Sequence, residues 1–207
     1  MIGISPFNAT DPCTRECLEV GARPLRPFLA GKIYTQATHG DCYSSVCETD
    51  DQALTANRLY AWRFMSECVA AFDQIGTWLK TGVDGSHVRL GVYDSGDDGM
   101  PITLLAESEE MATGTAQNNT AISSSIALSL RRGVSWLSMI SDAAIKPRAY
   151  FGYNGGGIQP IYYAAYNSQT LTSSGLIATQ TYGALPATFP SYAAFDSISW
   201  RIGIRKA

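Results

Sequence analysis

A regular alternation of apolar and polar residues near the end of the chain constrains its fold most. From residue 198 to residue 205, isoleucine or tryptophan alternates with serine, arginine or glycine. Successive side chains of a β-strand point to opposite faces, so this segment predicts a strand with one buried and one solvated face. Residues 122–130 show the same alternation. Residues 134–140 are largely apolar at both odd and even positions, which is typical of a strand covered on both faces.

Further strands are predicted at residues 60–65, 87–93 and 102–106, and the Asp- and Gly-rich residues 94–101 predict a hairpin turn between the last two. Residues 69–79 contain enough alanine for a helix, but their glycine and β-branched residues favour a strand with a bulge. Residues 154–190 are rich in Gly, Ser, Thr, Tyr and Pro and predict long loops with at most two short strands.

About eight strands with turn signals between them, and no convincing long helix, predict an all-β fold. We expect an antiparallel two-sheet β-sandwich, a jelly roll, over residues 58–207. Residues 1–57 lack a sustained period and predict an irregular N-terminal arm or anchoring segment. Trp62, Trp136 and Trp200 fall at inward strand positions and are expected in the core, whereas the place of Trp78 stays open.

Charge and hydropathy narrow the range of partners. The formal net charge is −3, and Lys and Arg are scattered singly, so no basic stripe indicates binding to nucleic acid. No apolar run approaches the ~20 residues that a membrane-spanning helix needs, so membrane insertion is not expected. The first residues lack the pattern of a signal peptide, which predicts synthesis in a cytoplasm.

Four of the five cysteines gather with one histidine in the first quarter of the chain. A reducing cytoplasm argues against a disulfide framework, so three interpretations stay open: a zinc site, disulfides formed after release, or unligated apolar thiols. The spacings fit zinc knuckles poorly. The candidate zinc ligands are Cys13, Cys17, His39, Cys42 and Cys47, and the fifth cysteine is Cys68.

Catalytic groups are sparse in this sequence. His39 and His87 are the two histidines, and no GxSxG elbow is present. Glu107, Glu109 and Glu110 could supply paired carboxylates for glycan hydrolysis, but a solvated loop explains them equally well. No phosphate-binding motif is present, so we expect neither an enzyme nor a bound cofactor.

The turn at residues 94–101 offers a candidate calcium site. Asp94, Asp97 and Asp98 could provide carboxylate ligands around a tight glycine-containing loop. Asp and Gly are also the ordinary residues of turns, and a hydrophilic hairpin is the favoured alternative.

Tyrosine and asparagine crowd into the loop-rich late region. Exposed aromatic rings stack on sugars and anchor protein interfaces at little cost in side-chain entropy. We therefore expect the recognition surface for a glycan or a protein to include Tyr153, Asn154, Tyr162, Tyr163, Tyr166, Asn167 and Tyr182.

Six segments between residue 58 and residue 207 follow one another in a recognisable order: LYAWRF at 59–64, GVYDSGDDGMP at 91–101, LLAES at 104–108, RRGVSWLSMI at 131–140, LPATFP at 185–190 and SWRIGIR at 199–205. This order of segments resembles the jelly-roll domains of bacteriophage fibre, spike and other minor virion proteins.

The resemblance implies a non-enzymatic virion structural or attachment protein, assembled in the host cytoplasm. Its β-sandwich would bind a host-surface glycan or another virion protein, and the protein would form a homotrimer. The alternatives are a stand-alone carbohydrate-binding module and, third, a glycan hydrolase.

Overall fold

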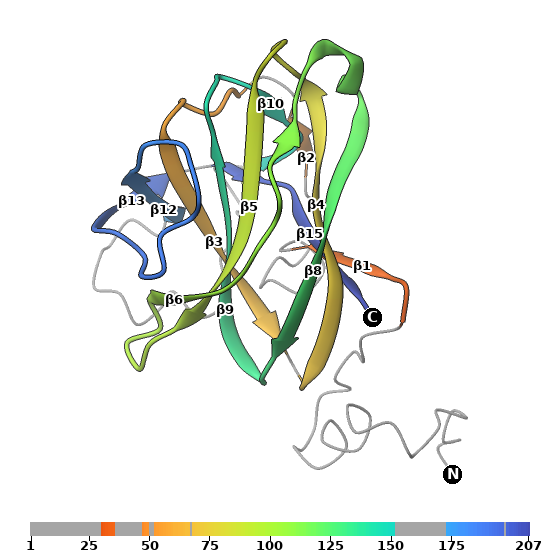
Figure 1. Cartoon of the computed structure of the whole chain (residues 1–207). Helices are drawn as coiled ribbons and strands as arrows, with labels where there is room; N and C mark the ends of the chain where they lie inside the picture. Colours follow the sequence, from red (N-terminus) through yellow and green to blue (C-terminus); the bar gives the residue numbers. More distant parts are fainter. Residues whose placement is uncertain (1–29, 36–46, 50–51, 67, 152–172, 197) are drawn as a thin grey trace.

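The computed structural model describes residues 30–35, 47–49, 52–66, 68–151, 173–196 and 198–207. These residues form β-strands joined by turns, with one short 3₁₀-helix at Thr115–Gln117 and no α-helix in the described ranges. The predicted all-β fold is confirmed: two antiparallel sheets pack face to face as a sandwich (Figure 1).

The first sheet has five strands, which are β1 (Ile33–Thr35), β15 (Ile202–Lys206), β4 (Ala70–Thr81), β10 (Lys146–Pro147) and β8 (Thr120–Leu130). The second sheet has seven, which are β13 (Tyr192–Asp196), β12 (Ser173–Thr179), β3 (Arg58–Ser66), β9 (Gly133–Ser141), β5 (His87–Ser95), β6 (Pro101–Glu107) and β7 (Met111–Ala112). A small third sheet contains β14 (Ile198–Trp200), β11 (Ala149–Phe151) and β2 (Cys47–Thr49).

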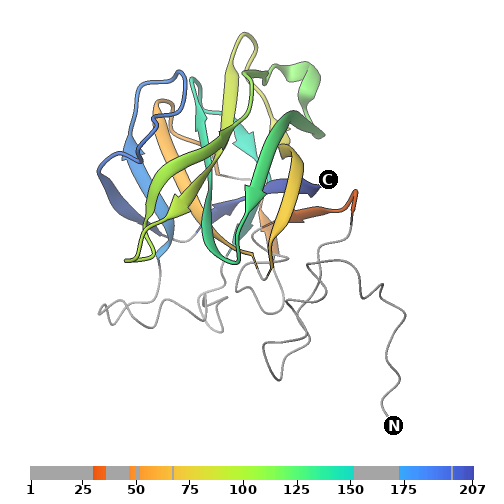
Figure 2. The same ribbon diagram turned by 60° about the horizontal axis from the view of Figure 1, so that its bottom comes forward.

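Two long pairs of consecutive strands link the large sheets. β3 lies in the seven-stranded sheet and β4 in the five-stranded sheet, while β8 and β9 make the same crossing in the opposite direction. The two pairs lie side by side, because β3 pairs with β9 and β4 pairs with β8. The chain is thereby rolled around both layers, as in a jelly roll (Figures 1 and 2).

The main core lies between the two large sheets and contains an aromatic cluster. Tyr60 stacks on Trp62 with ring centroids 5.9 Å apart, and Trp200 meets Trp62 edge-on at 5.4 Å. Phe64 and Phe72 form another edge-on pair, at 6.4 Å. Burial of such large rings is the main favourable term that holds two sheets together.

A second core lies on the other face of the seven-stranded sheet. There the segment 180–190 crosses the sheet and buries Leu185 and Phe189 against Tyr93. The Tyr93 hydroxyl donates a hydrogen bond to the Pro186 carbonyl oxygen at 2.9 Å. Gly91 permits this approach, because a Cβ there would lie 2.2 Å from Leu185 Cδ1. This sheet is therefore covered on both faces in its middle.

The expected strands are present. Residues 94–101 contain the turn of the hairpin that joins β5 to β6, as predicted. Residues 70–79 form most of β4, as predicted, and the strand has a register irregularity between Phe72 and Gln74, away from Gly76. Trp62, Trp136 and Trp200 are buried, whereas Trp78 is half-buried on the outer face of β4.

The last predicted strand is divided in the structure. It splits at Arg201 into β14, in the small sheet, and β15, in the five-stranded sheet. The alternation continues through the break, so periodicity alone did not reveal the change of sheet. Within residues 1–57, β1 pairs with β15 and β2 pairs with β11, so at these two places the N-terminal segment extends the sheets.

Cys68 is fully buried at the corner between β3 and β4 and is disulfide-bonded. The interpretation of the cysteines as unligated thiols therefore does not hold at this position. The side chains of the other four cysteines lie outside the described residues.

Candidate functional site

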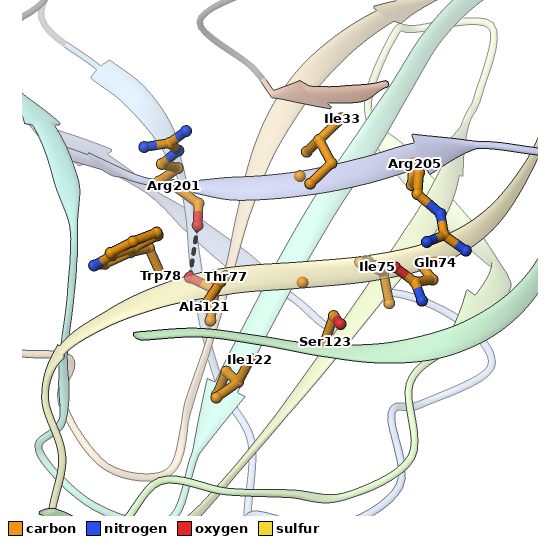
Figure 3. Close-up of a pocket in the computed structure, with 12 residues that line it drawn as sticks. Ile33, Gln74, Ile75, Thr77, Trp78, Ala121, Ile122, Ser123, Arg201 and Arg205 are labelled. Carbon is orange, nitrogen blue, oxygen red and sulfur yellow. Dashed lines mark hydrogen bonds between the residues drawn. The ribbon is translucent and has the colours of Figure 1, made fainter. Parts of the chain in front are cut away.

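A groove crosses the outer face of the five-stranded sheet (Figure 3). Its floor is formed by Gly76 on β4 and Gly203 on β15, which are cross-strand partners. Ile75, Ile202 and Ile204 point into the main core, so alternation turns the two glycines outward. The groove exists because two neighbouring outward positions carry no side chain.

Packing within the sheet excludes a larger residue at Gly76. A Cβ there would lie 2.6 Å from the Ile122 carbonyl oxygen and 2.9 Å from Ser123 Cβ. Gly76 therefore permits the close approach of β4 to β8, as an isolated glycine within a strand often does. Gly76 is therefore needed for the pairing of β4 with β8, and it also forms part of the floor of the groove.

Polar and aromatic side chains form the two banks. One bank carries Arg205 and Gln74, which are register neighbours on β15 and β4. The other carries Trp78 and its β8 partner Ala121, together with Arg201, which precedes β15. The banks are four residues apart along β4, which corresponds to roughly 13 Å at a rise of about 3.3 Å per residue.

Hydrogen bonds and stacking orient the side chains of both banks. The Arg205 guanidinium donates from Nε and Nη2 to the two carboxylate oxygens of Asp73, at 2.9 and 2.8 Å. These bonds lower the pKa of Asp73, so its carboxyl group stays ionised. On the other bank, the Arg148 guanidinium stacks over the Trp78 ring at 5.2 Å from its centroid. A guanidinium over an indole face is a favourable cation–π contact that limits motion of the ring.

The dimensions of the groove suit an extended ligand better than a compact one. Its volume is about 200 Å³, below the ~300–1,000 Å³ typical of pockets that enclose a compact ligand. A ligand would therefore lie across the strands as an extended chain and remain partly exposed. An indole, an amide, a hydroxyl and two guanidinium groups provide an apolar surface beside hydrogen-bond donors.

A second cluster of polar side chains lies on the seven-stranded sheet, beside segment 180–190. His87 Nδ1 lies 3.3 Å from Asp142 Oδ2, and His87 Nε2 lies 3.9 Å from Glu110 Oε1. Arg89 pairs with Glu107 at 3.1 Å and with Glu110 at 3.8 Å. This is the largest group of titratable side chains that the structure brings together in the described part of the chain.

Contacts in this cluster hold the covering segment in place. Glu107 Oε1 accepts a second hydrogen bond from the Leu185 backbone N–H at 2.9 Å. Glu110 Oε2 accepts from the Tyr182 hydroxyl at 3.1 Å. Two of the three glutamates that the sequence offered as candidate paired carboxylates, Glu107 and Glu110, therefore attach segment 180–190 to the end of β6 and the turn that follows it.

A nucleophile beside His87 would be needed for a hydrolase of the Ser-His-Asp kind. Ser86 is buried, and its hydroxyl contacts the Val83 carbonyl oxygen at 2.6 Å and the Thr113 hydroxyl at 2.8 Å. Ser141 donates its hydroxyl to the His87 backbone carbonyl, not to the ring. In the described ranges, the side chains that pair with the His87 ring are the carboxylates of Asp142 and Glu110.

The candidate calcium ligands have other partners. Asp94 pairs with Arg131 at 2.9 Å, and Asp98 Oδ1 accepts from the Met100 backbone N–H at 2.9 Å. Asp97 is exposed in the same turn. Across the residues that the structure describes, no three His, Cys, Asp or Glu side chains gather as a metal site. These contacts match the hydrophilic-hairpin interpretation of the turn.

Other predicted site residues fall outside the described ranges. Of the predicted recognition surface, Tyr182 is described, whereas Tyr153, Asn154, Tyr162, Tyr163, Tyr166 and Asn167 are not. The same holds for the candidate zinc ligands Cys13, Cys17, His39 and Cys42, and for the side chain of Cys47. In the described ranges no helix is long and apolar enough to cross a membrane.

The groove residues were not predicted from the sequence. Their grouping depends on the registers of β15, β4 and β8, which bring together residues far apart in the chain. Two signals were present: a lone glycine inside a predicted strand, and Trp78, whose place in that strand stayed open.

Replacement of Glu110 by Gln should lower the pKa of the Tyr182 phenol. Burial and the nearby Glu110 carboxylate raise this pKa above the ordinary 10.0, so the neutral phenol is favoured in the folded state. The stability that Tyr182 contributes is therefore complete below pH 10.0 and lost as the pH rises through the higher folded pKa. Titration of labelled tyrosine by NMR, assigned with Tyr182→Phe, measures the shift. An unchanged titration of Tyr182 in Glu110→Gln would contradict the assigned role of Glu110.

Comparison with models of known protein families finds no match to this chain. Comparison with curated protein sequences likewise finds no relative.

Proposed function

We propose that this protein is a non-enzymatic attachment protein whose β-sandwich binds a glycan in the groove on the five-stranded sheet. The observation that carries the proposal is the open floor of Gly76 and Gly203 between a bank with Trp78 and a bank with Gln74 and Arg205. Sugar rings present apolar faces to aromatic side chains and hydroxyl groups to polar ones.

Gln74 supports this proposal because its amide can donate and accept hydrogen bonds at once. Within the described residues its side chain forms no hydrogen bond, although it is half-buried at the edge of the groove. Ser123 adds an exposed hydroxyl group from β8. Groups of this kind can replace the water molecules that hydrate a sugar.

The resemblance of residues 58–207 to jelly-roll domains of phage fibre and spike proteins supplies the biological setting. In that setting the protein belongs to the virion, is assembled in the host cytoplasm, and contacts other virion proteins as well as a host-surface glycan. The seven-stranded sheet, whose middle is covered by segment 180–190, provides a rigid support for recognition on the opposite sheet.

Two substitutions in the groove should weaken glycan binding without unfolding the protein. Trp78→Ala removes the aromatic surface, and Ser123→Phe places a ring over the glycine floor; each should reduce affinity at least about tenfold. Ser129→Ala is the matched control, since Ser129 is exposed on β8 away from the groove residues. Immobilised bacterial glycans provide the binding measurement, and circular dichroism the folding control. Wild-type affinity in both groove variants would reject the groove as the glycan site.

The oligomeric state separates a virion protein from a stand-alone carbohydrate-binding module. A virion protein of this kind should form a closed homotrimer, in which several weak sites act together and raise the avidity. Light scattering on the full chain should therefore give a single trimeric mass over a wide range of concentration. A monomer at every concentration would favour the stand-alone module and contradict the trimer.

A further inference from the structure

We infer that the glycan recognised by the groove is acidic, a sugar chain that carries carboxylate groups. This inference rests on the proposed glycan-binding function and specifies the chemical class of its ligand. It is drawn from the distribution of charge over the sheets, from the pairing of Arg205, and from the hydrogen-bond donors on the two banks.

Charge is distributed unevenly over the two large sheets. In the seven-stranded sheet, the strands contain three arginines and three Asp or Glu residues. In the five-stranded sheet, the strands contain four basic residues, Lys80, Lys146, Arg205 and Lys206, and one acidic residue, Asp73. Arg148 and Arg201 adjoin the same sheet. The strands that carry the groove therefore contain more basic than acidic residues, in a protein whose formal net charge is −3.

The single carboxylate of this sheet is already occupied. Asp73 accepts both of its short hydrogen bonds from Arg205, through Nε and Nη2. Arg205 Nη1 is not part of that pair, and it belongs to a side chain that lines the groove. The pair fixes the guanidinium in place, and Nη1 is the nitrogen that can donate to a ligand.

Hydrogen-bond donors lie on both banks of the groove. Arg205 lies beside Gln74 on one bank, and Arg201 lies beside Trp78 on the other (Figure 3). Guanidinium groups bind carboxylates through short, charge-assisted hydrogen bonds, which are roughly twice as strong as neutral ones. An acidic chain that lies across the strands between the banks could direct carboxylates toward either bank while its sugar rings cover the glycine floor.

A matched pair of ligands tests this inference. One is an oligosaccharide of uronic acids, and the other is the same oligosaccharide with its carboxyl groups reduced to alcohols. Calorimetry at low salt should show that the acidic chain binds roughly tenfold more tightly than the reduced chain. One charge-assisted hydrogen bond accounts for a difference of about this size. The difference should shrink near 1 M salt, where the screening length is about 3 Å.

Variants of the ion pair give the sharper result. Asp73→Asn removes the only carboxylate of the sheet and should increase affinity for the acidic chain while leaving the reduced chain unchanged. Replacement of Arg201 and Arg205 by Gln should abolish the preference for the acidic chain. Ser129→Ala serves again as the control on the same sheet.

The outcomes separate this inference from the proposed function. Equal binding of the two chains, with both lost in Trp78→Ala, would overturn the acidic ligand and keep the glycan groove. Tighter binding of the acidic chain that does not respond to Asp73→Asn or to the arginine variants would also overturn the inference. Absence of binding to either chain and to every other glycan tried would reject the proposed function as well.

Discussion

The contact between Trp62 and Trp200 is the interaction on which the rest of the structure depends. Trp62 belongs to β3 of the seven-stranded sheet, and Trp200 to β14, two residues before the chain enters the five-stranded sheet. Both rings are almost fully buried, and their centroids lie 5.4 Å apart. Close packing of two such rings fixes the spacing of the layers and the position at which β15 begins.

The position of β15 determines the groove. The Thr77 hydroxyl donates to the Arg201 carbonyl oxygen at 2.6 Å, and Ile202 pairs with Thr77. This register places Gly203 beside Gly76 and Arg205 beside Gln74. A shift of β15 by one residue would turn the isoleucines outward and fill the groove with them. The core contact and the surface feature are therefore parts of one arrangement.

The sequence predicted the architecture well because most of its strands are half-buried and follow a period of two. Residues 122–130 and 134–140 are clear cases, since the first alternates and the second is buried on both faces in the structure. β1 and β2 were missed, because three residues are too few to establish a period. The break at Arg201 was missed because the alternation continues through it.

The candidate site was much less predictable than the fold. Its residues come from strands that are distant in sequence, and neither periodicity nor turn signals show which distant strands become neighbours. The predicted Asp cluster has the composition of a calcium loop, but Arg131 and a backbone N–H in the turn occupy Asp94 and Asp98. Composition identifies the available chemical groups, whereas register decides which of them meet.

The most direct test of the account is to map ligand contacts by NMR. Backbone amide shifts of the full chain would be recorded during titration with a glycan that it binds. The largest changes should occur at Gly76, Trp78, Ser123 and Gly203, on three adjacent strands of the five-stranded sheet. Changes confined to segment 180–190 and to the His87 cluster, with the groove residues unaffected, would contradict the proposed glycan groove.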